Sequence, residues 1–246
     1  MTLEQDIVLF KNKVAVITGG SGGIGFAVSS ALVDRGVKVV IGDVLKKEGQ
    51  EAVDNLNKRV GKVVAIFQYC DVRYYNDLKK LFNVAETKFG GVDIAILNAG
   101  LGFTPGSALE VMDDESERLI FDVNIGGVVK GNKVAMMHLV KRQGGVIINT
   151  ASIAGVTTTV GMGAYSATKH AVVGWTRALD HLQVLGIRVN AVCPSWTDTN
   201  IIKLPKDADG NPHDFSAVLD ACPLVPMEKV VNAFLDCIRN EEHVGT

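Results

Sequence analysis

The chain of 246 residues contains no apolar run of transmembrane length. Its formal net charge is only −2, and its basic residues are scattered along the sequence. Neither feature suits nucleic acid or an anionic membrane as a partner. Residues 1–10 include Glu4 and Asp6 and lack the basic start and long apolar core of a signal peptide. We therefore expect a cytoplasmic protein that binds neither nucleic acid nor membrane.

Cysteine and histidine are few and dispersed. The four cysteines stand far apart with no C-x-x-C spacing, and the five histidines are isolated from one another. This pattern is typical of reduced thiols in a cytosolic protein, and it disfavours a disulfide framework or a zinc site. We expect no metal in the site.

Short apolar runs alternate with amphipathic stretches along most of the chain. The expected strands are residues 13–18, 37–42, 62–69, 92–97, 146–150 and 187–193, and the expected helices are residues 26–35, 46–59, 76–89, 114–141, a segment around Tyr165 that runs to 185, and 227–240. Strands that alternate with helices predict an α/β fold, with a doubly wound parallel sheet covered by helices on both faces. The length suits one domain over residues 1–246.

Prolines gather in one place. Residues 194–226 hold five of the six prolines and break the alternation of strand and helix. We expect an irregular segment there, of the kind that covers an active site.

The first expected strand is followed by a glycine-rich turn and then by a helix. Residues 19–25 fit G-x-G-x-x-G from Gly20 and also fit a second register that begins at Gly19. In either register the glycines let the backbone approach a pyrophosphate, which then lies on the helix N-terminus. The alternative is a surface turn that binds no ligand. The expected dinucleotide contacts in this turn are Gly19, Ser21, Gly22, Gly23, Ile24 and Gly25.

Asp43 ends the second expected strand, eighteen residues after Gly25. A carboxylate there can accept hydrogen bonds from both hydroxyls of an adenosine ribose, and it repels a 2′-phosphate. The nearby Lys46 and Lys47 weaken this preference, and Asp43 could instead cap the following helix. The expected cofactor is NAD in preference to NADP.

Tyr165 and Lys169 are four residues apart, so on a helix they lie on one face. A lysine ammonium beside a tyrosine favours the phenolate and lowers the phenol pKa toward the working range. Ser152, thirteen residues before Tyr165, adds a hydroxyl that can hold an alcohol or carbonyl oxygen. The alternative is an amphipathic helix with a tyrosine at its edge.

Cofactor motifs over nearly the whole chain resemble those of the short-chain dehydrogenase/reductase family. Residues 18–25 resemble its TGxxxGIG loop, which selects the second register. Residues 98–100 resemble the end of its NNAG motif, with Leu97 in place of the first asparagine. The resemblance implies a single-domain Rossmann fold. It also extends the expected cofactor contacts to Asp71, Val72, Asn98, Ala99, Gly100, Tyr165, Lys169, Pro194, Thr197 and Thr199.

The catalytic residues of that family also have counterparts. Ser152, Tyr165 and Lys169 match three of them, and Asn124 stands where the family carries the fourth. The resemblance implies hydride transfer between the nicotinamide and a carbinol or carbonyl carbon, with Tyr165 as base or acid. Lys169 would lower the tyrosine pKa and bind the nicotinamide ribose, Ser152 would steady the substrate oxygen, and Asn124 would place a water behind Lys169. Alone, Asn124 would suggest a polar helix residue bonded to nearby backbone.

Two further features, besides Leu97, depart from the family pattern. Ser195 replaces the usual glycine after Pro194. After the helix at 227–240 the family has a final strand, whereas this sequence stops at Thr246. A protein that ended there would leave one sheet edge bare.

The residues expected to wall the substrate are mainly apolar. They are Leu101, Phe103, Val156, Met162, Trp196, Ile201, Ile202, Leu204 and Phe215. We expect an NAD-dependent oxidoreductase that acts on a lipophilic or aromatic secondary alcohol or its ketone, although these side chains could equally pack the segment onto the body. The opening run and NAD preference resemble hydroxyprostaglandin dehydrogenase-like and insect alcohol dehydrogenase-like members. Alternatives are an NADPH-dependent biosynthetic ketoreductase and a non-catalytic NAD(H)-sensing protein. The family implies a homodimer or homotetramer, joined through helices at about 114–141 and 163–185.

Overall fold

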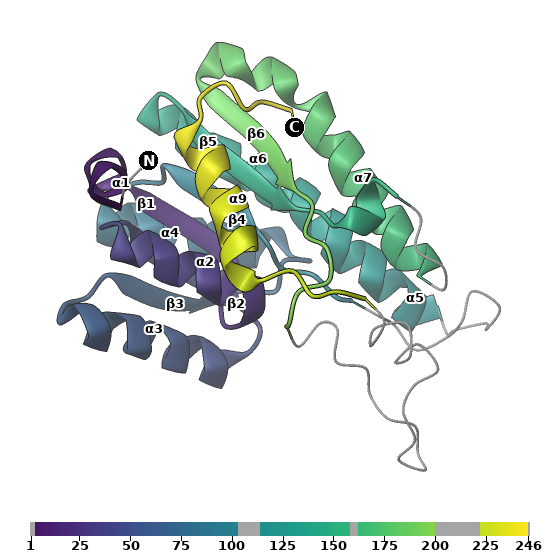
Figure 1. Ribbon diagram of the computed structural model, residues 1–246, viewed down its shortest axis with the longest axis horizontal. Coiled ribbons are helices and arrows are strands. Elements are labelled where there is room, and N and C mark those ends of the chain that lie inside the picture. The colour runs from purple at the N-terminus through teal and green to yellow at the C-terminus, as the bar shows by residue number, and fades with distance from the viewer. Residues whose placement is uncertain (1–2, 103–113, 158–161, 200–221, 246) are drawn as a thin grey trace.

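A parallel sheet of six strands runs through the part of the chain that the structure describes (Figure 1). The computed structural model describes residues 3–102, 114–157, 162–199 and 222–245. The strands are β1 (Val14–Thr18), β2 (Lys38–Asp43), β3 (Ala65–Tyr69), β4 (Ile94–Leu97), β5 (Gly145–Thr150) and β6 (Ile187–Val192). Their order is β3-β2-β1-β4-β5-β6, and every neighbouring pair is parallel. Strands β1 to β3 extend the sheet to one side and β4 to β6 extend it to the other, so the strand order reverses between β1 and β4. Ligands of such sheets bind at this switch point.

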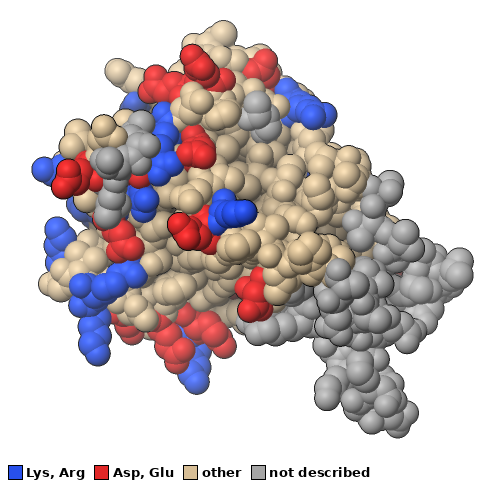
Figure 2. Space-filling view, in the orientation of Figure 1, with Lys and Arg blue, Asp and Glu red and all other residues tan. Residues whose placement is uncertain are grey.

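Helices cover both faces of the sheet, as the sequence predicts. The α-helices are α1 (Leu3–Phe10), α2 (Gly23–Asp34), α3 (Lys46–Val60), α4 (Tyr75–Phe89), α5 (Asp114–Phe121), α6 (Val128–Leu139), α7 (Gly163–Ala178) and α9 (Met227–Arg239). One face carries α2, α3 and α9, and the other carries α4, α6 and α7 (Figure 1). On the face with α2, α3 and α9, acidic and basic side chains lie interspersed (Figure 2).

Two buried layers explain why the apolar strand runs are continuous. In β1, Ala15 and Ile17 pack toward α2 and α9, whereas Val14 and Val16 pack toward α4 and α6. Side chains alternate between the faces of a strand, so a strand covered on both sides needs apolar residues throughout. This burial holds the carboxyl ends of the strands in place, and the candidate site lies at those ends.

Several predicted boundaries need correction. The helix expected over 114–141 is interrupted by a π-helical segment, η1 (Asp122–Gly127), and ends in the 3₁₀ turn η2 (Val140–Arg142). The helix expected to reach 185 is α-helical only to Ala178 and continues as the 3₁₀ segment η4 (Asp180–Leu185). Another 3₁₀ turn, η3 (Ile153–Gly155), follows β5. Helix α1 was not predicted. Its Asp6 forms an ion pair with the distant Arg239, and such a contact does not show in the local pattern of apolar and polar residues.

Residues after α9 run along the edge of the sheet that was expected to be bare. The Gly245 amide donates to the Val189 carbonyl of β6 at 2.9 Å, and the Asn190 amide group donates to the His243 carbonyl at 2.8 Å. Arg188 donates to the carbonyls of Cys237 and Ile238 at the end of α9. The tail thus supplies part of the cover that a further strand would provide.

Candidate active site

The glycine loop joins β1 to α2 and requires glycine for steric reasons. Gly19 has a φ of +63°, in the left-handed region. A Cβ on Gly25 would lie 2.2 Å from the Gly19 carbonyl oxygen. The loop is also tied to the neighbouring strand, since the Asn98 side chain donates to the Gly19 carbonyl at 3.0 Å. The Thr18 hydroxyl accepts from the amides of Asn98 and Ala99 at 3.0 and 3.1 Å. These bonds bring the two predicted cofactor motifs together.

Asp43 lies at the carboxyl end of β2 and reaches back to the glycine loop. One of its carboxylate oxygens, Oδ2, accepts from the Ser21 amide at 3.2 Å and from the Ser21 hydroxyl at 2.5 Å. The other oxygen, Oδ1, accepts from the Leu45 amide at 3.1 Å, just before α3. The carboxylate therefore stands at the cavity and is also bonded to the residue just before α3, but it does not cap that helix as in the alternative interpretation, since Leu45 is the N-cap residue and no side chain bonds there as a cap. Its position is fixed by three donors.

Asp71 pairs with Arg73 two residues later. The Arg73 guanidinium lies 2.6 Å from the Asp71 carboxylate, and the Arg73 amide donates to the same group at 3.0 Å. The guanidinium, aided by the amide, holds the pKa of Asp71 below its usual range despite the cost of burial. Asp71 and its neighbour Val72 line the cavity at the end near Asp43.

Helix α7 and the end of β5 bring together three of the predicted catalytic residues. The Lys169 Nζ donates to the Thr150 carbonyl at 2.8 Å and lies 5.6 Å from the centre of the Tyr165 ring. Ser152 follows β5, is buried, and accepts from the Ala154 amide at 3.2 Å. Tyr165, Lys169 and Ser152 all line one cavity.

Burial dominates the proton affinities of this group. Burial raises the pKa of the Tyr165 phenol above its usual value, and the Ser152 hydroxyl opposes this shift without cancelling it. Burial also lowers the pKa of the Lys169 ammonium to about 8. The prediction that the Tyr165 pKa is lowered is therefore wrong in this structure, because burial raises it. A phenolate and an ammonium both lose hydration at this depth, so each group is pushed toward its neutral form.

Asn124 lies in η1 and is fully buried. Its side-chain carbonyl accepts from the Leu101 amide at 2.7 Å, and its amide group donates to the Leu101 carbonyl at 2.9 Å. The same amide group donates to the Thr168 hydroxyl at 3.2 Å. Asn124 therefore joins the segment after β4 to α7, beside Lys169. Its side chain behaves as in the alternative interpretation, as a polar residue bonded to backbone.

The segment that follows β6 closes the other side of the cavity. Thr197 is buried, and its hydroxyl donates to the Ser195 carbonyl at 2.8 Å. A Cβ on Gly23 would lie 3.3 Å from the Thr199 methyl group, so this segment meets the glycine loop. Pro194 lines the same cavity.

One cavity of about 460 Å³ joins these groups, a size typical of small-molecule sites. Of the predicted cofactor and catalytic residues, only Gly25 and Asn124 do not line it. The remaining ones do, namely Gly19, Ser21, Gly22, Gly23, Ile24, Asp43, Asp71, Val72, Asn98, Ala99, Gly100, Ser152, Tyr165, Lys169, Pro194, Thr197 and Thr199. The cradle at the glycine loop and the anchored carboxylate fit a dinucleotide.

The substrate wall is described only in part. Leu101, Met162 and Trp196 line the cavity. Val156 is 49% exposed and does not line it. The other expected wall residues, Phe103, Ile201, Ile202, Leu204 and Phe215, lie outside the described residues.

A family model described as short chain dehydrogenase matches residues 13–209. The chain belongs to the short-chain dehydrogenase/reductase family. The meso-2,3-butanediol dehydrogenase of Serratia marcescens is 40% identical over 194 residues, which span 78% of this chain and 74% of that protein. Family membership makes the chain an oxidoreductase of the alcohol dehydrogenase type.

Solved structures agree with this fold. A short-chain type dehydrogenase/reductase from Mycobacterium marinum has a TM-score of 0.84 at 27% identity, covering 98% of this chain and 95% of that one. A 3-ketoacyl-(acyl-carrier-protein) reductase from Brucella melitensis, complexed with NADH, has a TM-score of 0.82 at 27% identity, covering 96% and 95%. The single Rossmann-type domain is therefore the family's own fold.

Some residues of this short-chain dehydrogenase site were not predicted. Thr150 supplies the carbonyl that holds Lys169, and Thr168 accepts from Asn124. Val44 and Leu45 line the cavity beside Asp43. Thr150 carries a positional signal, because it ends a strand at the same edge as Asp43 and Asn98. Thr168 carries no such signal, since its role depends on which helix packs against it.

The described ranges lack both a membrane-spanning helix and a metal-binding cluster. Within them, no helix is long and apolar enough to cross a bilayer. The same ranges hold no group of three or more histidine, cysteine, aspartate or glutamate side chains placed to bind a metal ion.

Proposed function

We propose that this protein is an NAD-dependent oxidoreductase that interconverts a secondary alcohol and its ketone. One observation carries the proposal. Ser152, Tyr165 and Lys169 line the same cavity as the carboxylate of Asp43, which is held by Ser21. A proton-transfer group and a ribose-binding group thus share one continuous space.

The cofactor would be held at four places. The glycine loop and the N-terminus of α2 would hold the pyrophosphate, and Asp43 would accept from the adenosine ribose hydroxyls. Lys169 would donate to the nicotinamide ribose, and residues 194–199 would hold the carboxamide. A bound nicotinamide supplies the redox chemistry by accepting a hydride from the alcohol or returning one to the ketone. The NADH complex of the Brucella melitensis reductase supports this choice of cofactor.

Tyr165 would move the proton of the substrate oxygen. Its raised pKa keeps the phenol protonated at neutral pH and ready to donate to a ketone oxygen. In the direction of alcohol oxidation the phenol must first lose its proton, so that rate should rise with pH. Lys169, with a pKa of about 8, is mostly protonated at neutral pH and then lies as a cation beside the protonated phenol. Ser152 would donate to the substrate oxygen as negative charge develops there.

The substrate would be lipophilic or aromatic. Leu101, Met162 and Trp196 line the cavity. Apolar walls with few convergent polar groups bind apolar ligands. The diol dehydrogenase of Serratia marcescens, by its name, also acts on a secondary alcohol.

Two other functions are weaker candidates. An NADPH-dependent ketoreductase agrees with the protonated phenol, but the anchored carboxylate of Asp43 would repel a 2′-phosphate. A non-catalytic NAD(H) sensor does not require a buried Lys169 beside Tyr165. The first of these differs from the main proposal in cofactor, and the second in turnover.

The test measures NADH formation with a panel of apolar secondary alcohols, with NAD⁺ and NADP⁺ in parallel. The expected result is turnover with NAD⁺ that increases as the pH is raised. Tyr165→Phe should reduce the rate by about 10²- to 10⁴-fold and leave NADH binding intact. Preference for NADP⁺ would overturn the cofactor assignment. Tight NADH binding without turnover on any alcohol or ketone would favour the sensor.

We further propose a cytoplasmic homodimer or homotetramer that associates through α6 and α7. Residues Ala171 and Met137 are exposed on these helices, whereas Val128 and Val172 belong to the core. Light scattering coupled to gel filtration tests the proposal. A monomer at micromolar concentration would contradict it.

A further inference from the structure

Tyr69 ends β3 directly beside Asp43. The two residues are paired in the parallel register of β2 and β3. The next amide, that of Cys70, donates to the Asp43 carbonyl at 3.0 Å. The ring of Tyr69 is therefore carried at the same sheet edge as the carboxylate expected to hold the ribose. Tyr69 does not itself line the cavity.

Lys46 is the first residue of α3, three positions after Asp43. Its Nζ lies 5.0 Å from the centre of the Tyr69 ring, within the range of a cation–π contact. The preceding Val44 and Leu45 line the cavity, and Lys46 does not. The lysine closest to Asp43 in sequence thus lies over an aromatic ring on the β3 side.

The other nearby groups are also engaged. The Lys47 Nζ lies 4.0 Å from the Glu51 carboxylate, one turn along α3. Both the amide and the hydroxyl of Ser21 donate to Asp43. A 2′-phosphate at this edge would meet a fixed carboxylate. Among the described residues at this edge, the Ser21 donors are bonded to Asp43, and both Lys46 and Lys47 have another partner.

We propose that Tyr69 is a specificity-determining residue that holds Lys46 away from the 2′ position of the adenosine ribose. The proposal rests on the proposed NAD-dependent function. Lysine is a common phosphate ligand, and a phosphate carries close to two negative charges. A released Lys46 would offset the repulsion by Asp43, and the discrimination against NADPH would decrease. The contact between Lys46 and Tyr69 therefore adds to the selectivity that Asp43 provides.

Equilibrium binding of NADH and NADPH tests this without knowledge of the substrate. Titration calorimetry would compare the wild type with Tyr69→Leu, which removes the aromatic face. An exposed cation–π contact has a strength that corresponds to about a 2- to 5-fold change in a binding constant. Tyr69→Leu should therefore tighten NADPH binding about 2- to 5-fold and leave NADH binding unchanged.

Two further variants serve as controls. Tyr69→Phe keeps the ring face and should match the wild type for both dinucleotides. The double variant Tyr69→Leu with Lys46→Met should lose the gain in NADPH affinity, because the released cation is absent. The proposal is overturned if Tyr69→Phe and Tyr69→Leu behave alike, or if the double variant keeps the gain. Wild-type protein that binds NADPH more tightly than NADH would instead overturn the proposed cofactor, a separate outcome.

Discussion

Lys169 shows how a single site residue can lower the stability of the fold that holds it. Its ammonium is buried 5.6 Å from the centre of the Tyr165 ring and donates to a backbone carbonyl, that of Thr150. Burial lowers its pKa from the ordinary lysine value of 10.5 to about 8. The unfolded chain therefore binds the Lys169 proton more tightly than the folded protein does. This difference opposes folding at pH values below 8.

Replacement of this lysine should stabilise the protein while removing activity. At 1.36 kcal/mol per pKa unit, the shift corresponds to roughly 3 kcal/mol at pH 7. Part of this is offset in Lys169→Met, because the Thr150 carbonyl loses its donor. We expect Lys169→Met to raise the free energy of unfolding by about 1–2 kcal/mol at pH 7, measured by urea denaturation.

The pH dependence separates this cause from a general gain in packing. Between pH 8 and pH 10.5, unfolding of the wild type takes up a proton at Lys169, so the wild type gains stability as the pH rises through this window. The advantage of Lys169→Met over the wild type should therefore vanish as the pH approaches 10, where the lost bond to Thr150 leaves the variant equal to or less stable than the wild type. A difference that is independent of pH would show that burial of the charge is not its source.

At the scale of single elements, the turn from β1 into α2 has the strictest steric requirement. A Cβ at position 25 would lie 2.2 Å from the carbonyl oxygen and 2.9 Å from the carbonyl carbon of Gly19. Both are backbone atoms that cannot move without disturbing the loop. We expect Gly25→Ala to lower the free energy of unfolding by about 3 kcal/mol or more and to abolish NADH binding.

Gly22→Ala is the matched control for this prediction. Gly22 has extended backbone angles, and an added Cβ would meet nothing within 4 Å. Thermal unfolding followed by circular dichroism should place Gly22→Ala within about 0.5 kcal/mol of the wild type. Equal destabilisation of the two variants would contradict a steric role that is specific to Gly25.

The interrupted helix from α5 to α6 serves the site in another way. A π-helical turn at 122–127 contains Asn124, whose side chain bonds to both backbone groups of Leu101. π-Helical turns inside α-helices are frequently found at functional sites. The π-helical turn departs from regular α-helical geometry. Through Asn124 it fixes the position of the segment after β4, which lines the cavity.

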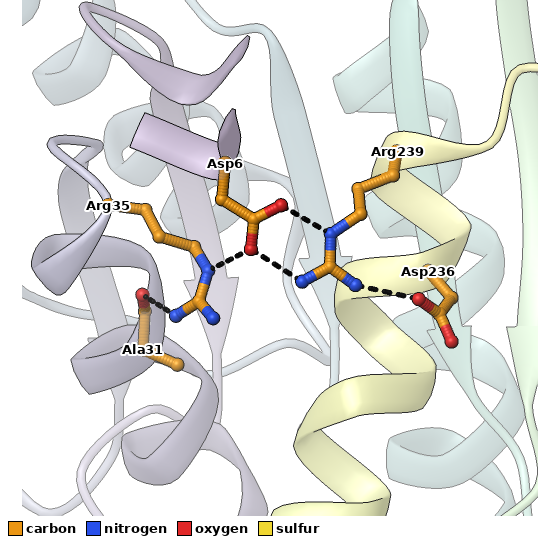
Figure 3. A network of polar contacts seen from close by, with 5 residues as sticks. All are labelled: Asp6, Ala31, Arg35, Asp236 and Arg239. Carbon is orange, nitrogen blue, oxygen red and sulfur yellow. Dashed lines mark hydrogen bonds and ion pairs between the residues drawn. The ribbon is translucent and has the colours of Figure 1, made fainter. Parts of the chain in front are cut away.

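At the scale of the whole molecule, one buried carboxylate joins three helices that are distant in sequence. Asp6 of α1 lies between Arg35, which follows α2, and Arg239 of α9 (Figure 3). Asp6 is 1% exposed, and its oxygens accept from the two guanidinium groups at 2.6 to 2.7 Å. Helix α2 carries the glycine loop, and α9 follows the segment whose Val225 amide donates to the Trp196 carbonyl. The carboxylate thus joins the supports of both sides of the cavity.

Loss of this carboxylate should destabilise the molecule. Asp6→Asn leaves two largely buried guanidinium groups without their anion, and the expected loss is about 3 kcal/mol in the free energy of unfolding at pH 7. Asp236→Asn is the control, because its carboxylate contacts the same Arg239 but is 62% exposed. We expect a loss below about 1 kcal/mol there. Chemical denaturation of both variants gives the comparison.

The effect of Asp6 should also depend on pH. The guanidinium groups of Arg239 and Arg35 lower the Asp6 pKa below the ordinary aspartate value of 3.8, although burial opposes them. A carboxyl group with a lowered folded-state pKa contributes stability above its unfolded pKa and loses it as the pH falls through the folded value. The difference between the wild type and Asp6→Asn should therefore be complete at pH 6 and decline below about pH 4. A constant difference would contradict the role of the charge.

The sequence by itself determined the succession of strands and helices after α1, the glycine loop and many of the residues that line the site. Apolar runs and amphipathic periods depend on near neighbours in the chain, and the glycine spacing depends on a local turn. Asp43 and Ser152 each follow or end a strand at the carboxyl edge of the sheet, so a parallel arrangement is enough to bring them near each other.

Only the tertiary structure decided how these groups behave. The upward shift of the Tyr165 pKa follows from loss of hydration, which depends on everything that packs around the phenol. Asn124 meets Leu101 across 23 positions, and Asp6 meets Arg239 across 233. The contact of Lys46 with Tyr69 requires β3 to lie beside β2. Desolvation and long-range pairing are properties of the folded neighbourhood, and no local pattern in the sequence encodes them.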